Sequence, residues 1–438
     1  SFQIFIMASR SVALLTPRSS TAFVARLLNT SPPADSAAPA QSTTKTNETT
    51  SAPPPVEKEQ KKDHARTFYR SEMVTIPALP SEKIPKPTGE LPFGKYYSDH
   101  MIDVDWTLEG GWGKPKLHRL QPLQLHPGSK VLHYAIELFE GMKAYRGIDN
   151  KIRMFRPDMN MARMNRTAQR SALPTFDSDE LINMIADQIR LDLEWVPSSA
   201  TSSLYIRPTL IGTDKTLGVG NPHDAKLFVV TCPVGSYFTS GFQPVSLLAD
   251  SQFVRAFPGG VGAYKMGCNY APTIGVAQSA QAKGCQQVVW LSGDNEELTE
   301  VGTMNIFVFW KNEEGDLELA TPPLDKGIIL PGVTRDSLLH LGKEYGEFKV
   351  SERSFTMEDI RLALKEDRLL QMFGAGTACV VSPVGQIVYH NRKADKYETW
   401  NIPTMDAKPN LMQRFYEHIT DIQYGRVDRP EWCFEVKE

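Results

Sequence analysis

The sequence contains few cysteines, little net charge and no long apolar run, and each of these absences argues against a class of protein. The five cysteines among 438 residues are scattered and odd in number, which argues against a disulfide scaffold and fits a reducing compartment. A formal net charge of -3 produces no field that would attract nucleic acid or an anionic membrane. No apolar run approaches the length of a membrane-spanning helix, so we expect neither nucleic acid nor a membrane as a partner.

Histidine gives no indication of a metal site. The nine histidines form no H-x-x-x-H pattern and no mixed Cys/His spacing, so we expect no bound metal. The remaining composition, 41% hydrophobic and 23% charged, is ordinary for a globular protein, and 438 residues are enough for two or three domains. The function must therefore be sought in the motifs.

The first 64 residues differ in composition from the rest. Residues 7–33 contain three arginines, many Ser and Thr, and no acid, which is typical of a mitochondrial transit peptide. A disordered tail without a targeting role is the alternative. Residues 34–64 are rich in Pro, Ser, Thr and Ala and nearly lack large apolar side chains, so they should remain disordered. We therefore expect a transit peptide over 1–33, a linker over 34–64 and a location in the mitochondrial matrix.

The rest of the chain mixes strands with helices. Apolar patterning predicts strands at 100–107, 117–125, 141–146, 151–155, 203–211, 226–234, 245–250, 287–291, 304–310 and, as a pair, 369–389. Helical periodicity and end signals predict helices at 131–139, from Asp158, at 178–196, 270–283, 331–345, after Thr356 and at 409–424. This order lacks the strict alternation of a doubly wound sheet, so we expect an α/β fold of the α+β type. A short passage containing Gly and Ser at 235–242 marks the expected boundary between domains over 65–236 and 237–438.

One lysine is surrounded by glycines in the stretch FPGGVGAYKMGCNYAPT, residues 257–273. Glycines near Lys265 would let the backbone pass close to a bulky planar group. A lysine held in such a place can lose its proton and attack a carbonyl, as the Schiff-base lysine of pyridoxal phosphate enzymes does. A lysine in a flexible surface loop would give the same pattern, so this stretch alone does not decide.

A pyridoxal phosphate site would also need an acid and a phosphate cradle. Glu300, expected in a polar turn before the strand at 304–310, is the candidate acid because a carboxylate keeps a pyridine nitrogen protonated. A solvated turn acid is the alternative. Residues 332–334, at a helix start, and 374–377, at a turn, offer backbone amides to a phosphate. One face of the helix that begins at Asp158 could add a bidentate contact, although such faces are more often only solvated; it carries Arg163, Arg166 and Arg170.

Seven stretches carry the most specific signal. They are LFEGMKAYRG (138–147), RMFRPDMNMARMNR (153–166), LYIRPTLIG (204–212), GAYKMGCNYAPT (262–273), LTEVGTMN (298–305), LPGVTRDSLL (330–339) and FGAGTACVV (373–381). Together they resemble branched-chain amino acid aminotransferases, above all the eukaryotic mitochondrial and cytosolic enzymes, from Phe68 to the end of the chain. The resemblance implies a fold-type IV pyridoxal phosphate enzyme: a smaller N-terminal α/β domain, a larger cofactor-binding domain with a barrel-like sheet, and a homodimer.

The resemblance also implies roles in cofactor binding. Lys265 would form the Schiff base with pyridoxal 5′-phosphate and move the proton between the substrate Cα and the cofactor C4′. Glu300 would pair with the pyridine nitrogen, and Tyr270 would bond the phenolic oxygen. The phosphate and the rest of the cofactor would be held by Arg163, Thr303, Val333, Thr334 and Thr377.

The same resemblance assigns the substrate site. The substrate carboxylate would be received by Tyr134 and by the backbone amides of Thr377 and Ala378. The side-chain pocket would be formed by Phe93, Phe139, Tyr205, Thr303 and Ala378, with Tyr237 nearby. Leu217 to Val219 would reach across the dimer and cap the partner's pocket.

Tyr205 and Arg207 lie two residues apart on one predicted strand, so they should face the same way. Branched aliphatic side chains need an apolar wall, whereas the distal carboxylate of glutamate needs a cation, which Arg207 can supply. The resemblance implies a transaminase that moves the amino group of L-leucine, L-isoleucine or L-valine to 2-oxoglutarate by a ping-pong route, giving branched 2-oxo acids and L-glutamate.

The chain departs from the vertebrate members of this family at one motif. Where those members carry a redox Cys-x-x-Cys, it has Cys379-Val380-Val381-Ser382, and a serine cannot complete a disulfide. We therefore expect Cys379 to be a buried small residue without a thiol switch.

Two other functions share parts of the pattern. A D-amino acid aminotransferase or an aminodeoxychorismate lyase-like enzyme would use the same cofactor and fold, but the Tyr205/Arg207 pair and the loop at 217–219 favour the branched-chain enzyme. A catalytically idle homologue that acts as a binding partner is the other alternative. The presence of every catalytic position argues against it.

Overall fold

The computed structural model describes residues 62–199, 201–235 and 242–437. The expected transit peptide, nearly all of the expected linker, most of the expected domain boundary at 235–242, and Tyr237 lie outside these ranges. In the described part of the chain, no helix is both long enough and apolar enough to cross a bilayer.

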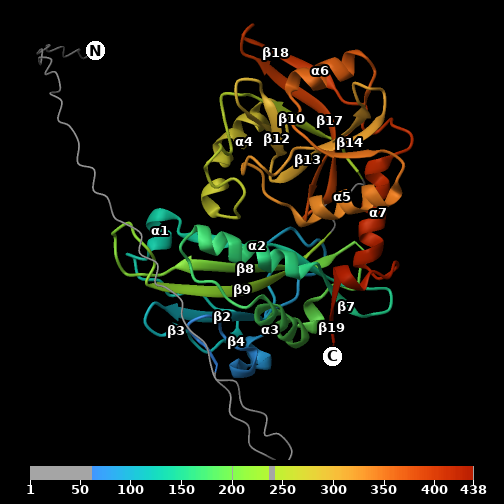
Figure 1. Ribbon diagram of the computed structural model, residues 1–438. Coiled ribbons are helices and arrows are strands. Elements are labelled where there is room, and N and C mark those ends of the chain that lie inside the picture. Colours follow the sequence, from blue (N-terminus) through green and yellow to red (C-terminus); the bar gives the residue numbers. More distant parts are fainter. Residues whose placement is uncertain (1–61, 200, 236–241, 438) are drawn as a thin grey trace, which may run out of the picture. The chain divides into compact units, whose positions relative to one another are not determined.

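The first half of the described chain builds a ten-stranded sheet in the order β1-β4-β2-β9-β8-β6-β7-β19, with β3 beside β2 and β5 beside β8 (Figure 1). Its strands are β1 (Val74–Ile76), β2 (His100–Thr107), β3 (Gly111–Trp112), β4 (Lys116–Arg119), β5 (Glu137–Phe139), β6 (Met142–Arg146), β7 (Ile152–Phe155), β8 (Ser203–Gly212), β9 (Asp224–Val234) and β19 (Cys433–Val436). The last strand comes from the end of the chain and pairs with β7, so the C-terminus returns to the first sheet.

Three helices and three short 3-10 turns accompany this sheet: α1 (Lys130–Tyr134), α2 (Pro157–Arg170), α3 (Ser178–Leu191), η1 (Arg70–Glu72), η2 (Pro80–Glu82) and η3 (Leu193–Trp195). Helices α2 and α3 contribute Met161, Met164, Ile185 and Ile189 to the apolar core of the first sheet. The spacing of these residues gives each helix one apolar face, which explains why both helices pack where they do.

The second sheet has nine strands, six of which close on themselves. The path β12-β11-β10-β17-β16-β13 is joined at its ends by the pairing of β12 with β13, which makes a six-stranded barrel. Its strands are β10 (Val245–Ala249), β11 (Gln287–Ser292), β12 (Glu297–Val301), β13 (Met304–Lys311), β16 (Leu369–Gly376) and β17 (Val380–Asn391), extended by β14 (Leu317–Thr321), β15 (Lys349–Glu352) and β18 (Lys396–Asn401). The expected barrel-like sheet is therefore confirmed.

The helices and turns of this half are α4 (Thr273–Ala282), α5 (Val333–Tyr345), α6 (Met357–Lys365), α7 (Leu411–Gln423), η4 (Gly267–Asn269) and η5 (Pro430–Trp432). Strand β13 shows why they are needed. Its residues Ile306, Val308 and Trp310 join one apolar cluster, while Phe307 and Phe309 join another that contains residues of α5 and α7. Because successive side chains of a strand point to opposite faces, β13 is buried on both sides and is apolar nearly throughout.

Several expected elements match the structure closely. Strand β2 spans the predicted residues 100–107, helix α5 ends at the predicted Tyr345, and Thr356 and Asp359 form the predicted capping box of α6. Three expected elements end clearly earlier than predicted. The strand from 117 ends at Arg119, the helix near 131–139 ends at Tyr134, and the helix predicted at 178–196 ends at Leu191.

The expected turn around Glu300 is wrong. Residues Glu297–Val301 form strand β12, which pairs with both β11 and β13, and Glu300 is buried within it. Its polar neighbours in the sequence suggested a solvated turn, but barrel closure requires a strand at this place.

Candidate active site

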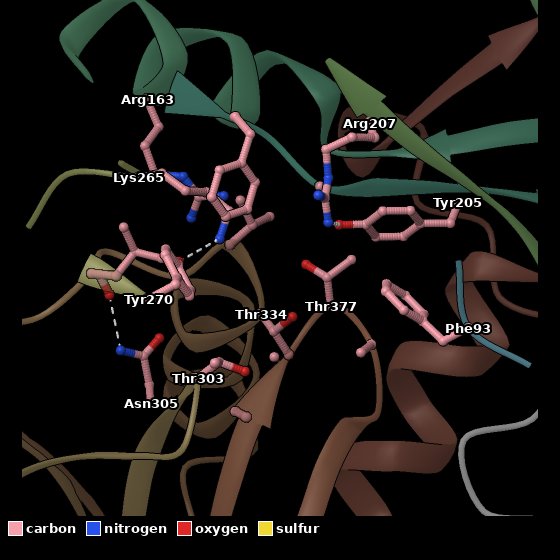
Figure 2. A pocket seen from close by; sticks show the side chains of 18 residues that line it. Phe93, Arg163, Tyr205, Arg207, Lys265, Tyr270, Thr303, Asn305, Thr334 and Thr377 are labelled. Carbon is pink, nitrogen blue, oxygen red and sulfur yellow. Dashed lines mark hydrogen bonds between the residues drawn. The ribbon is translucent and has the colours of Figure 1, made fainter. Parts of the chain in front are cut away.

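A cavity of about 350 Å³ lies between the first sheet and the barrel (Figure 2). Twelve of the residues predicted for the site line it: Phe93, Phe139, Arg163, Tyr205, Arg207, Lys265, Tyr270, Thr303, Val333, Thr334, Thr377 and Ala378. They come from distant parts of the chain, so the fold brings together what the sequence separates. Within the described residues, no group of His, Cys, Asp or Glu side chains is arranged to hold a metal.

Lys265 is held in place on both sides. Its Nζ donates a hydrogen bond to Tyr270 Oη at 3.0 Å and lies 4.9 Å from the centre of the Phe139 ring (Figure 2). Its backbone carbonyl accepts from Phe139 N at 3.1 Å, and its backbone N–H donates to Thr167 Oγ1 at 3.3 Å. These contacts from β5 and α2 do not fit a flexible surface loop.

One glycine of the lysine loop is required by close packing. A Cβ at Gly262 would lie 2.6 Å from the carbonyl oxygen of Ile328, which real side chains do not tolerate. The loop therefore presses against the segment that leads to α5.

Glu300 is 3% exposed and does not line the cavity, although its neighbours Asn305 and Leu330 do. Its Oε1 accepts from Leu330 N at 2.8 Å, and its Oε2 lies 3.0 Å from Arg255 Nε. Burial raises the pKa of the Glu300 carboxyl, while Arg255 and the Leu330 amide act against that rise. The sequence analysis missed Arg255, because no local pattern connects it to Glu300.

Arg163 forms a buried bidentate pair with Glu140, a residue that the sequence analysis did not single out. Arg163 Nε lies 2.7 Å from Glu140 Oε1, and Nη2 lies 2.7 Å from Oε2. Arg163 Nη1 also donates to Pro331 O at 2.9 Å, which links α2 to the start of α5. Burial alone would raise the pKa of the Glu140 carboxyl, but Arg163 and Asn160 outweigh this effect, and the pKa lies below its usual value.

The other two arginines of the predicted basic face are not part of the cavity lining. Arg166 donates to Ala263 O at 2.9 Å, and the Arg170 guanidinium lies 5.9 Å from the centre of the Tyr264 ring. Both arginines therefore contact the loop that carries Lys265 from a position outside the cavity.

The N-terminus of α5 opens into the cavity. Val333 and Thr334 line it, and Gly332 precedes them without a side-chain cap. The first backbone N–H groups of a helix have no partner within the helix and attract anions. A Cβ at Gly332 would lie 2.1 Å from Asn305 Oδ1, so a larger residue there would displace the Asn305 side chain. This end of the cavity is suited to a phosphate.

The opposite side of the cavity is aromatic with one cation. Arg207 Nη2 donates to Tyr205 Oη at 2.8 Å, as expected for residues on the same face of β8. The Arg207 guanidinium lies 4.6 Å from the centre of the Phe139 ring, and Phe93 packs against Tyr205 with centroids 4.7 Å apart. Arg207 Nε is buried and has no hydrogen-bond partner among the described residues, while the residue as a whole lines the cavity.

Three predicted substrate residues lie away from this cavity. Tyr134 Oη donates to the carbonyl oxygen of Leu217, and neither residue is part of the lining. Leu217 and Val219 are 62% and 81% exposed. The structure does not bring Tyr134, Leu217 or Val219 to the cavity of their own chain.

Cys379 is buried next to the cavity. Its Sγ lies 3.3 Å from Met304 Sδ, and burial raises the pKa of its thiol to about 12. Ser382, the position of the absent second cysteine, is also buried. Both observations agree with the interpretation of Cys379 as a packed small residue.

Comparison with known proteins places this arrangement among aminotransferases. The family Amino-transferase class IV matches residues 137–387. A cytosolic branched-chain-amino-acid aminotransferase of Caenorhabditis elegans is 62% identical over 382 residues, which are 87% of this chain and 92% of the relative. A mitochondrial branched-chain-amino-acid aminotransferase of Rattus norvegicus is 52% identical over 356 residues, which are 81% of this chain and 88% of the relative. The fold matches that of the branched-chain amino acid aminotransferase of Thermobaculum terrenum in its PLP-form, with a TM-score of 0.61 at 18% identity, over 80% of this chain and all of that one.

The buried Arg163–Glu140 pair gives a prediction about stability. Glu140→Gln should lower the free energy of unfolding at pH 7 by about 3–5 kcal/mol, because it leaves a buried guanidinium without its counter-ion. Since the folded-state pKa of Glu140 lies below its unfolded value of 4.5, the contribution of this carboxylate is complete above about pH 4.5 and is lost as the pH falls through the folded-state pKa. The difference in the free energy of unfolding between Glu140→Gln and the parent should therefore become smaller as the pH falls.

Thermal unfolding of both proteins between pH 3.5 and 7 measures this. Glu358→Gln is the matched control, because Glu358 pairs with Arg361 on the exposed surface of α6 and should contribute less than about 1 kcal/mol. An equal effect of the two substitutions, or a difference independent of pH, would contradict the account.

Proposed function

Because this chain belongs to the branched-chain-amino-acid aminotransferases, within the class IV aminotransferase family, we propose that it transfers the amino group of L-leucine, L-isoleucine or L-valine to 2-oxoglutarate with pyridoxal 5′-phosphate as its cofactor. The products are branched 2-oxo acids and L-glutamate. The observation that carries the proposal is one cavity that joins a lysine amine, the N-terminus of a helix beside Arg163, and an aromatic wall that contains Arg207.

The residues around the cavity fit the cofactor chemically. Bound pyridoxal phosphate supplies an aldehyde that takes up the substrate amine and a ring that withdraws electrons from the substrate Cα. For its phosphate the chain offers Arg163 and the free amides at the start of α5, with the Thr334 and Thr377 hydroxyls nearby. Glu300, buried behind the cavity lining and paired with Arg255, is the acid that we assign to the ring nitrogen.

Lys265 is the group that moves the proton. Its Nζ is held by Tyr270 Oη at 3.0 Å, so the amine has a fixed position from which it can take a proton from the substrate Cα and return it. Phe139 and Tyr270 flank the amine and limit the access of water to it.

The substrate side of the cavity suits two different side chains. Phe93, Phe139 and Tyr205 give the apolar wall that an aliphatic side chain needs. Arg207 lies in the same wall with its Nε without a partner among the described residues, and it can bind the distal carboxylate of glutamate or 2-oxoglutarate. The neutral Tyr205 hydroxyl holds Arg207 when an aliphatic substrate is present.

We propose a homodimer in which the loop around Leu217 and Val219 covers the partner's cavity. Both side chains are highly exposed, and Tyr134 is tied to this loop rather than to the cavity of its own chain. Such a loop, apolar at its tip and fixed at its base, is suited to a contact with a second copy of the chain.

We further propose that the protein acts in the mitochondrial matrix and that 65–236 and 237–438 are its two domains. The composition of residues 7–33 supports the location, although the relatives include both mitochondrial and cytosolic proteins. Recovery of the protein in the matrix fraction of cells tests the location, and recovery only in the cytosol would contradict it.

Lys265→Ala should abolish transamination. Without its amine, the variant should lack the visible absorbance that pyridoxal phosphate gives when joined to the protein, and its rate with L-leucine should fall about 1,000-fold or more. Lys283→Ala is the control, because Lys283 follows α4 and lies outside the cavity lining. A Lys265→Ala protein with the parent's spectrum and rate would overturn the proposal, as would a parent that prefers D-alanine to L-leucine.

Arg207→Gln should separate the two substrate classes. Loss of the guanidinium removes the partner of the distal carboxylate, so kcat/KM for L-glutamate should fall about 100-fold, while that for L-leucine changes less than about threefold. Arg207→Lys keeps the charge but not the paired donors, so its kcat/KM for L-glutamate should lie between those of the parent and of Arg207→Gln. Equal losses for both substrates would contradict the assignment.

Mixed dimers test the cap. A chain with Leu217→Ser and Val219→Ser keeps Lys265 but covers its partner's cavity poorly. A Lys265→Ala chain lacks the amine but keeps an intact loop, which can cover its partner's cavity. Co-expression should produce a heterodimer with one complete site, which has Lys265 from one chain and an intact loop from the other. Its activity should be about half that of the parent dimer. A heterodimer as weak as either variant alone, or a parent that is monomeric, would contradict the proposal.

A further inference from the structure

The side chain of Lys143 connects the first sheet to the barrel through a hydrogen bond. It lies on β6, opposite Tyr205 of β8, so the two side chains share the face of the first sheet that forms the wall of the cavity. Its Nζ donates a hydrogen bond to the carbonyl oxygen of Ala378 at 2.9 Å. Ala378 belongs to the barrel, in the loop between β16 and β17.

The environment of this ammonium is unusual for a lysine. Lys143 is only 8% exposed, and among the described residues no carboxylate pairs with it. Burial lowers the pKa of Lys143 to about 8, and the thiol of Cys379 acts weakly against this shift. A buried cation without a counter-ion weakens the folded state, so Lys143 is not explained by stability.

The loop that Lys143 holds is strained. It consists of Thr377, Ala378 and Cys379, since Gly376 and Val380 already pair across the hairpin. Val380 has φ of 65°, a left-handed conformation that a β-branched residue rarely adopts, and Val381 N donates back to Cys379 O at 2.9 Å. Such a backbone persists only where its surroundings hold it.

Packing alone does not fix this loop. Ala378 lines the cavity of the candidate active site and also a second cavity of about 360 Å³, to which Lys143 and Phe93 contribute as well. Cys379 is packed in the barrel core, but Ala378 has open space on both sides and depends on polar contacts for its position. The bond from Lys143 to the Ala378 carbonyl is such a contact, and it comes from the opposite sheet.

We propose that Lys143 is a positioning residue: it holds the Thr377–Cys379 loop, through the Ala378 carbonyl, in the conformation that receives the substrate α-carboxylate. The inference rests on the proposed function. Every substrate of the reaction carries a carboxylate next to its reacting carbon, so loss of Lys143 affects amino acids and 2-oxo acids alike. This distinguishes it from Arg207, which acts on only one substrate class.

The test is Lys143→Met, which has a similar shape and no charge, in the holoenzyme. The dissociation constants of 4-methylpentanoate and glutarate, followed by the cofactor absorbance, should both rise about tenfold, as expected for a misplaced set of hydrogen bonds to a charged group. The affinity for pyridoxal phosphate should fall less than the affinity for these two ligands, because Arg163 and the start of α5 also hold the phosphate and only Thr377 belongs to the displaced loop. The unfolding temperature should not fall, because the substitution removes a buried charge. Lys143→Gln keeps an N–H donor, so its two dissociation constants should lie between those of Lys143→Met and of the parent.

Arg146→Met is the matched control. Arg146 is on the same strand and also donates to backbone carbonyls, those of Leu193 and Val196, but it lies away from both cavities. It should leave both dissociation constants unchanged. A double-mutant cycle with Val380→Gly adds a second measurement: if Lys143 acts by holding the strained loop, the two effects on ligand affinity should be non-additive.

The possible outcomes separate the two proposals. If the parent takes up neither pyridoxal phosphate nor these ligands, the proposed function fails. If the parent binds them and Lys143→Met binds them equally well, the inference fails alone. A variant that is unfolded or less stable than the parent, or one that loses only the affinity for glutarate, would also overturn the role given to Lys143.

Discussion

The cost of burying charge is the constraint on which the region between the sheet and the barrel depends. An ion removed from water weakens the fold by several kcal/mol unless it is paired or fully hydrogen-bonded. Glu140 is therefore matched by Arg163, and Glu300 by Arg255. Arg163 also bonds the Pro331 carbonyl. The bond from Arg163 to Pro331 links α2 to the segment before α5, so a buried ion pair also joins the two halves of the described chain.

The same contacts leave the right groups free. In the described part of the chain, the Lys265 amine is hydrogen-bonded only to the Tyr270 hydroxyl, the start of α5 has no side-chain cap, and Arg207 Nε has no partner. The buried carboxylates are thus paired with arginines, while the Lys265 amine and the start of α5 remain without a charged partner in the described part of the chain. The two substrate classes share an α-carboxylate and differ in the distal part of the side chain. The site therefore needs fixed groups for the α-carboxylate and groups that accept either an aliphatic chain or a carboxylate at the other end.

How far the sequence predicts the structure depends on how local each signal is. Strand β2 and the capping box of α6 follow from short patterns, and both were predicted correctly. The family was recognised because its motifs contain most of the residues that line the cavity. Glu300 was placed in a turn because its partners, the Leu330 amide and Arg255, are distant in sequence. Lys143 was missed for the same reason, since Ala378 lies 235 residues away and a lysine on a strand gives no local sign of such a partner.

The most direct test of the account is the identity of the lysine that joins the cofactor. The holoenzyme is reduced with borohydride, digested, and its labelled peptide is identified by mass spectrometry. The account predicts one pyridoxyl group per chain, on the peptide that contains Lys265. A label on Lys143, on Lys130 or on any other lysine, or no label at all, would contradict it.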